Sequence, residues 1–153
     1  IADRYTEWDL VILGEGGERR ALELQVERYG LAKRVWLPGR VGNLGEWYSR
    51  ADMYVMSSRF EGFPNTLLEA MAYGLPVVSF DCTTGPAELI EDGVNGYLVP
   101  EKEKDKGLAD RLETLMNDSD RRVSFGQMAK EVRRLFALEC VGAQWDSVLG
   151  LGE

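Results

Sequence analysis

The stretch richest in potential chemistry surrounds Pro64, where a helix is predicted to begin. The first N–H groups of a helix have no partner inside that helix, and together with the helix dipole they bind anions. Here these groups belong to Asn65, Thr66 and Leu67, and we expect them to be free and to point into a crevice. Gly62 lets the backbone approach a ligand closely, because glycine has no Cβ. The segment therefore suits a diphosphate.

Two carboxylates bracket this anion site, Glu61 just before the helix and Glu69 inside it. A carboxylate beside a diphosphate repels it by Coulomb's law unless the carboxylate serves another group. Pairs of neutral hydroxyls are the natural partners, since a carboxylate accepts two hydrogen bonds from a vicinal diol. A diphosphate with a diol on each side is a nucleotide sugar, with a ribose on one side and a hexose on the other. We therefore expect a site for a nucleotide sugar.

Several of these features also have a purely structural interpretation. Taken alone, Glu69 is more often a solvated helix residue, and Arg40 is equally well a plain surface cation. The glycines of segment 14–17 do not match G-x-G-x-x-G, so they indicate a turn that faces the crevice rather than a dinucleotide fingerprint. We expect segment 83–85 to shape a tight helix entry at Pro86, and the Tyr54 ring to be core or partly buried surface.

Short apolar runs alternate with helix-length segments up to Pro100, and after it the pattern is wholly helical. The predicted strands are 9–13, 35–37, 53–56, 76–80 and 97–99; the predicted helices are 18–29, 44–50, 64–73, 86–92, 107–117, 120–136 and 140–149. This alternation predicts a parallel sheet with helices on both faces. We expect one α/β domain over residues 1–153, a Rossmann-like doubly wound parallel sheet (1–100) with a helical C-terminal tail (101–153).

Composition excludes several function classes. The 153-residue chain has a formal net charge of −8, which argues against binding of nucleic acid through its phosphates. It contains no histidine, which removes the usual general base and most transition-metal sites. Its two cysteines, Cys82 and Cys140, are far apart and have no C-x-x-C partner, so a reducing, cytoplasmic setting fits best.

In an open parallel sheet of the kind predicted here, ligands bind beyond the carboxyl ends of the strands. The segment around Pro64 is predicted to lie at that edge.

The stretch EGFPNTLLEAMAYGLPVVSFD resembles the E-x7-E signature of retaining glycosyltransferases with the GT-B fold, known as family 4 or group 1. Its two acids are Glu61 and Glu69. The resemblance continues before the motif in LVILGEGGERRALE and VWLPGRV, and after it in GPAELIEDGVNGYLVP and FALECVGAQWDSVL. Nearly the whole chain is therefore covered, in the order of the family, as the C-terminal donor-binding domain.

The resemblance implies a role for each matching residue. Glu61 is expected to bind the hydroxyls of the donor sugar, and the backbone of Gly62, Phe63 and Pro64 is expected to line that sugar. Glu61 and Glu69 are the residues that we expect to carry catalysis.

The remaining contacts are expected on the nucleotide side. The N–H groups of Asn65, Thr66 and Leu67 are expected to bind the distal phosphate, and Glu69 is expected to hold the ribose diol. The loop with Arg40 and Val41 is expected to lie against the nucleobase. The Arg and Lys with which the family neutralises the diphosphate precede the segment where this chain starts.

The implied reaction is transfer of a hexose from a nucleotide diphosphate sugar, in our interpretation a UDP-sugar, with retention of anomeric configuration. The acceptor is expected on an amino-terminal domain of the same parent chain, so we expect this chain alone to bind donor without turnover. No metal and no other cofactor are implied, because GT-B enzymes use helix dipoles and basic residues where others use a cation bound by a D-x-D motif. The expected setting is polysaccharide synthesis in the cytoplasm, with peripheral association at the inner face of the membrane.

Two other classes stay open. A non-catalytic Rossmann-like nucleotide-binding or receiver-type module has the same general fold, but a receiver needs clustered acids after its first strand and a phosphoacceptor Asp. A nucleotide-sugar epimerase ordinarily needs a histidine in its site, and this chain has none.

Overall fold

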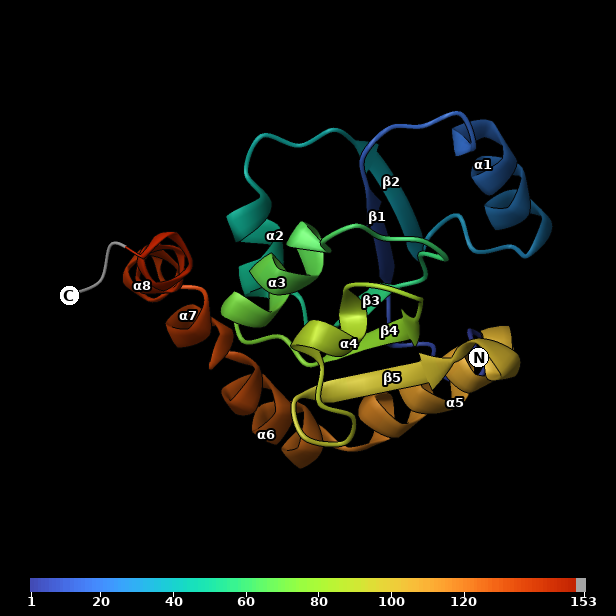
Figure 1. Cartoon of the computed structure of the whole chain (residues 1–153). Helices are drawn as coiled ribbons and strands as arrows, with labels where there is room; N and C mark the ends of the chain where they lie inside the picture. The colour runs from blue at the N-terminus through green and yellow to red at the C-terminus, as the bar shows by residue number, and fades with distance from the viewer. Residues whose placement is uncertain (151–153) are drawn as a thin grey trace. The chain divides into compact units, whose positions relative to one another are not determined.

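The computed structural model describes residues 1–150, with the exception of the side chain of residue 104. The chain forms two compact units, Ile1–Glu46 and Trp47–Glu153, whose elements are labelled in Figure 1. The predicted helical tail extends to residue 153, and residues 151–153 lie outside the described part.

The first unit is a strand–helix–strand unit. Strands β1 (Leu10–Leu13) and β2 (Val35–Gly39) pair in parallel, and helix α1 (Arg19–Arg28) connects them. The helix ends as the glycine at position 30 predicts, because the N–H of Leu31 donates to the carbonyl of Val26 at 2.9 Å in a Schellman-type closure. The parallel pairing of β1 with β2 is the arrangement that the alternation of strands and helices predicts.

The second unit is built on a three-stranded parallel sheet of order β3–β4–β5. Its strands are β3 (Tyr54–Met56), β4 (Val77–Asp81) and β5 (Gly96–Pro100). Helix α3 (Asn65–Ala72) connects β3 to β4, and the short helix α4 (Pro86–Leu89) connects β4 to β5. The sequence predicts one sheet, whereas the five strands form two hydrogen-bonded sheets, one in each unit.

Each face of the sheet in the second unit has its own core. Val77 and Val78 are both fully buried, and as neighbours in β4 they point to opposite faces. Val77 belongs to a cluster with Leu67 and Met71 of α3, and Val78 to a cluster with Leu115 and Phe125. The predicted covering of a parallel sheet on both faces is therefore found in this unit.

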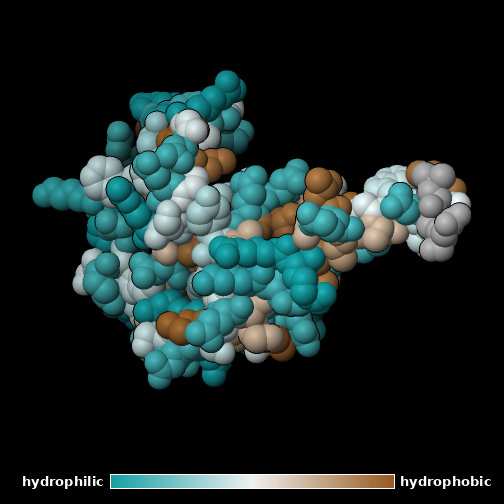
Figure 2. Space-filling model, turned by 90° about the vertical axis from the view of Figure 1, so that its left-hand side faces the viewer, coloured by the Kyte–Doolittle hydropathy of each residue, from teal (hydrophilic) through white to brown (hydrophobic). Residues whose placement is uncertain are grey.

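The remaining named elements of residues 1–150 are helical. Helix α2 (Leu44–Arg50) includes the last residues of the first unit and the first residues of the second. The tail begins with a 3-10 turn, η1 (Glu101–Glu103), and continues with α5 (Lys104–Asn117), α6 (Ser119–Ala129), α7 (Val132–Leu135) and α8 (Leu138–Leu149). Among residues 1–150, no helix combines the length and the apolar character that a membrane span requires. Figure 2 shows a mostly hydrophilic face on which apolar side chains form small separate patches.

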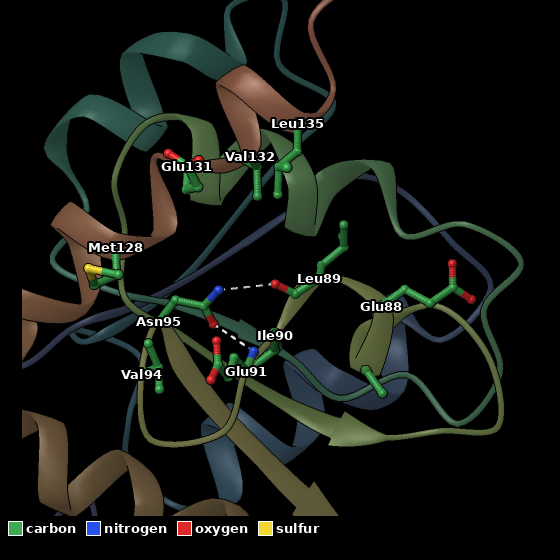
Figure 3. Close-up of a pocket in the computed structure, with 11 residues that line it drawn as sticks. Glu88, Leu89, Ile90, Glu91, Val94, Asn95, Met128, Glu131, Val132 and Leu135 are labelled. Carbon is green, nitrogen blue, oxygen red and sulfur yellow. Dashed lines mark hydrogen bonds between the residues drawn. The ribbon is translucent and has the colours of Figure 1, made fainter. Parts of the chain in front are cut away.

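The predicted helix 107–117 begins earlier, at Lys104, and two other predicted helices are divided or end early. The predicted helix 120–136 is divided into α6 and α7, and the predicted helix 86–92 ends already at Leu89. The early end of α4 has a clear cause in the side-chain amide of Asn95. This amide donates to the carbonyl of Leu89 at 3.1 Å and accepts from the N–H of Glu91 at 2.9 Å (Figure 3). It thereby satisfies the backbone groups that a longer helix would pair, and such a contact is not visible in a helical periodicity.

We predict that Gly126→Ala destabilises the protein, although the same change ordinarily stabilises a helix interior by up to about 1 kcal/mol. Gly126 of α6 lies against the backbone of Gly74, and a Cβ at position 126 would collide with the carbonyl oxygen of Gly74. Backbone cannot yield as a side-chain end does, so we expect a loss of about 1–3 kcal/mol in the free energy of unfolding.

Gly142→Ala in α8 is the matched control, because a Cβ there has no neighbour within 4 Å. Urea unfolding followed by circular dichroism measures both variants. Equal stability of the two would contradict the predicted contact between α6 and Gly74.

Candidate functional site

The loop before α3 is held against the loop before α4. Their parent strands β3 and β4 are neighbours, with Met56 opposite Ser79 in the register. The Thr84 hydroxyl donates a short hydrogen bond to the carbonyl of Glu61. A Cβ added at Gly85 would lie 2.7 Å from Cδ of Pro64 and 3.4 Å from the carbonyl oxygen of Gly62. The two loops are thus packed together at the carboxyl ends of adjacent strands.

This packing explains the local sequence at the two helix starts. Gly85 has φ of 98°, a backbone conformation that side chains other than that of glycine rarely adopt. Pro86 follows as the first helical residue of α4, as the sequence predicts. Pro64 is fully buried and stands just before Asn65, the first residue of α3. The two prolines therefore fix where both helices begin.

The first turn of α3 has fewer free N–H groups than the sequence predicts. The N–H of Asn65 donates to the carbonyl of Phe63 at 3.0 Å, and that of Leu67 donates to the carbonyl of Pro64 at 3.0 Å. The prediction of free groups is therefore wrong for Asn65 and Leu67, because the tight turn through Pro64 pairs them locally. Within residues 1–150, the N–H of Thr66 has no hydrogen-bond partner. The turn therefore offers one free backbone donor and the positive end of the helix dipole.

Two tyrosines without a predicted role in the site contact this turn. The Tyr48 hydroxyl donates to Oε2 of Glu69 at 3.2 Å and lies 3.3 Å from the carbonyl oxygen of Thr66. The Tyr54 hydroxyl donates to the Thr66 hydroxyl at 2.8 Å. Tyr54 is partly buried, as predicted, but its ring also carries this polar contact. The two tyrosines thereby connect the start of α3 to helix α2 and strand β3.

Burial and nearby acids raise the pKa values of both phenols. Burial raises the pKa of Tyr48 most, and the negative charge of Glu69 raises it further. For Tyr54, burial raises the pKa, the bond to Thr66 lowers it, and the charges of Glu61 and Glu69 raise it. The two acids of the motif therefore lie within electrostatic reach of the same hydroxyl. Glu61 is half-buried and Glu69 is exposed, so a ligand can reach both.

The Phe63 side chain has a partner in the tail. Its ring lies 5.7 Å from that of Phe136, centroid to centroid, at an interplanar angle of 53°. Phe136 follows α7 directly, so the loop that carries Glu61 and Gly62 also contacts the helical tail. The sequence-based prediction is that only the backbone of Phe63 lines the sugar. The position of the Phe63 ring does not test that prediction.

The predicted base-contacting residues lie in the first unit. Arg40 is exposed and Val41 half-buried, directly after the buried Gly39. The N–H of Gly14 donates to the carbonyl of Gly39 at 2.8 Å, and Arg19 donates to the carbonyl of Leu37 at 2.8 Å. The turn after β1 and the start of α1 thus hold the end of β2, directly before Arg40 and Val41. Residues 61–69 belong to the second unit.

The chain contains one D-x-D sequence, Asp118 to Asp120, and it has a structural role. Asp118 is the N-cap of α6, where its carboxylate accepts a hydrogen bond from the N–H of Arg121 at 2.9 Å. The other oxygen of Asp118 lies 3.3 Å from the Arg121 guanidinium. Aspartate commonly caps the first turn of a helix in this way.

A hollow of about 400 Å³ lies elsewhere in the second unit (Figure 3). Leu89, Ile90 and Val132 line its apolar part, and Glu91 and Glu131 stand among its polar lining. Glu88 also belongs to the lining, but its carboxylate extends away from the other side chains in Figure 3. No residue that the sequence predicts for the site lines this hollow.

We predict that Gly85→Ala damages the site and the fold together. The change adds strain at a positive φ, at a cost of about 1–3 kcal/mol, and pushes against the ring of Pro64. The start of α3 must shift as a result. Gly93→Ala is the matched control, since Gly93 also has a positive φ, of 78°, but a Cβ there meets nothing within 4 Å.

Urea unfolding gives the stability of both variants, and amide chemical shifts report the first turn of α3. We expect Gly85→Ala to lose about 1–3 kcal/mol more than Gly93→Ala and to shift the Thr66 amide. Identical losses with unchanged Thr66 shifts would show that the two loops are not packed as described.

Known proteins resemble this chain throughout. The amylovoran biosynthesis glycosyltransferase AmsD of Erwinia amylovora is 32% identical over 142 residues, which is 93% of this chain and 40% of AmsD. The crystal structure of Anabaena Alr3699/HepE in complex with UDP-glucose is 26% identical with a TM-score of 0.82, and covers 94% of this chain and 41% of that one. This chain thus spans less than half the length of either protein.

A shorter solved structure corresponds more closely in extent. It is the C-terminal domain of the glycosyl transferase group 1 family protein LpcC from Francisella tularensis, which is 32% identical with a TM-score of 0.77. The match covers 87% of this chain and 71% of that one. Together these structures confirm the predicted α/β architecture, that of a GT-B C-terminal domain. The family described as Glycosyl transferases group 1 matches residues 1–132, which includes parts of both compact units. The chain belongs to the glycosyl transferases group 1 family.

Proposed function

We propose that this chain binds a UDP-sugar, and that the protein to which it belongs transfers the hexose with retention of anomeric configuration. The observation that carries the proposal is the arrangement at α3: a helix start with a free N–H at Thr66, bracketed by Glu61 before it and Glu69 within it. The similarity to HepE, solved with UDP-glucose, supports a uridine nucleotide and a hexose.

The proposed phosphate contact is the first turn of α3. The N–H of Thr66 donates to a distal phosphate oxygen, and the dipole of the eight-residue helix adds a partial positive charge. During transfer, negative charge grows on the departing diphosphate, and a donor fixed beforehand stabilises that charge without reorganisation. We propose that this electrostatic contribution replaces a metal ion, and that the site uses no other cofactor.

The two acids take the hydroxyl groups on either side of the phosphates. Glu69 accepts hydrogen bonds from the ribose diol, and Glu61 accepts them from the hydroxyls of the hexose. The backbone of Gly62, Phe63 and Pro64 lines the sugar, and Arg40 and Val41 lie against the base. Positioning of the anomeric carbon is the main catalytic effect of Glu61 in this scheme.

The acceptor side of the reaction belongs to the rest of the protein. We propose that a separate amino-terminal domain binds the acceptor, in keeping with the span of this chain over 40% of AmsD. Polysaccharide synthesis in the cytoplasm, at the inner face of the membrane, is the proposed setting, by analogy with AmsD in amylovoran biosynthesis.

We predict that Glu69→Gln and Glu61→Gln separate the two halves of the ligand. Glu69→Gln weakens UDP and UDP-glucose alike by about tenfold, because a charged acceptor of the ribose diol is lost. Glu61→Gln weakens UDP-glucose by a similar factor but leaves UDP unchanged, since UDP carries no hexose. Isothermal titration calorimetry on the chain measures all four affinities.

NAD and FMN serve as control ligands for other nucleotide-binding functions. Saturable binding of NAD or FMN without binding of UDP would identify a different nucleotide-binding module and refute the proposal. Equal effects of the two substitutions on UDP would refute the division of roles between the acids.

A further inference from the structure

We propose that Tyr48 is the positioning residue for Glu69, and that it thereby sets the preference of the site for ribose over 2′-deoxyribose. The inference rests on the proposed function, because it assigns Glu69 to the ribose diol. What it adds is a residue outside the motif, on a different helix, that fixes how the Glu69 carboxylate is presented.

Tyr48 is suited to this role because its own position is fixed. Its side chain is only 7% exposed and belongs to the core cluster with Leu67 and Met71. Its ring lies 6.2 Å from that of Tyr54, edge-on at 64°, and 5.5 Å from that of Tyr73. A ring held by packing on several sides places its hydroxyl with little freedom.

The Tyr48 hydroxyl makes contacts that fix a side chain otherwise free to move. It donates to Oε2 of Glu69 at 3.2 Å and lies 3.3 Å from the carbonyl oxygen of Thr66, one helical turn earlier. Glu69 itself is exposed, and a solvated glutamate samples several rotamers that binding must freeze. Holding one rotamer in advance removes that entropic cost from ligand binding.

The bond from Tyr48 leaves the carboxylate able to bind a diol. An ionised carboxylate has about four lone-pair sites, so one donor at Oε2 leaves Oε1 and part of Oε2 for two hydroxyl groups. Burial and the charge of Glu69 raise the pKa of Tyr48, so the phenol keeps its proton and stays a donor. The Tyr48 hydroxyl therefore remains able to donate to the Glu69 carboxylate.

Two nearby tyrosines provide controls with the same chemical change. Tyr73 packs on the Tyr48 ring, but within residues 1–150 its hydroxyl makes no hydrogen bond, so Tyr73→Phe removes an uninvolved oxygen. Tyr54 bonds to the Thr66 hydroxyl and not to Glu69, so Tyr54→Phe affects the start of α3 without touching the carboxylate.

The test compares the affinities of UDP and 2′-deoxy-UDP by calorimetry for wild type and for Tyr48→Phe. The inference predicts that Tyr48→Phe weakens UDP by about tenfold and 2′-deoxy-UDP by about twofold, so that the ratio between them falls by about fivefold. Tyr73→Phe leaves both affinities unchanged, and Tyr54→Phe changes both by the same factor. Thermal unfolding of each variant shows whether the core is intact.

A second measurement joins Tyr48 to Glu69 directly. In a double-mutant cycle, Tyr48→Phe should have no further effect on UDP once Glu69→Gln is present, since there is no oriented carboxylate left to lose. Equal weakening of UDP and 2′-deoxy-UDP by Tyr48→Phe, no weakening at all, or full additivity in the cycle would each overturn the inference. If Glu69→Gln itself leaves UDP binding unchanged, the proposed function fails, and the positioning role fails with it.

Discussion

The packing of Pro64 beneath the backbone of Gly85 is the contact on which the candidate site depends. It joins the loops that follow two adjacent strands, and it decides where α3 begins. The short bond from the Thr84 hydroxyl to the carbonyl of Glu61 acts in the same direction. A helix start can bind an anion only if its N–H groups are left unpaired, yet an unpaired turn tends to fray. No side chain in the described part of the chain caps α3. Its first turn is instead held by contacts with the loop before α4 and by hydrogen bonds from Tyr48 and Tyr54.

The two acids are held by different elements of the structure. Glu61 belongs to a loop whose backbone is anchored at Thr84 and whose next aromatic residue, Phe63, packs on Phe136 of the tail. Glu69 belongs to a helix with a buried face, and its carboxylate is steadied by a phenol from α2. The acid proposed to contact the sugar is thus linked to the helical tail, whereas the acid proposed for the ribose is tied to the core. Under the proposed assignment, binding of the nucleotide and positioning of the sugar depend on separate sets of contacts.

Sequence patterns located the elements and the acids well, for physical reasons that act over a few residues. Apolar runs mark the strands, and prolines and glycines mark the helix ends, as at Pro86 and after Tyr73. What the patterns could not locate depends on contacts between distant segments. Asn95 ends α4 early by bonding to the backbone at Leu89, and a tight turn pairs the N–H groups of Asn65 and Leu67 that were predicted to be free. Tyr48 lies 21 positions before Glu69, so no local periodicity relates them.

Net charge poses the remaining question, because a chain of charge −8 is proposed to bind a diphosphate. Exposed charges act over about 8 Å at physiological ionic strength, so the surrounding field matters less than the immediate neighbours. Those neighbours include Glu61 and Glu69, whose negative charges repel a bare pyrophosphate. In a nucleotide sugar, the hydroxyls of ribose and hexose stand between the acids and the phosphates and convert each carboxylate from a repelling charge into a hydrogen-bond acceptor. In the proposed complex, the two acids disfavour free phosphate and pyrophosphate and favour the complete donor, so the charges that oppose anion binding provide selectivity.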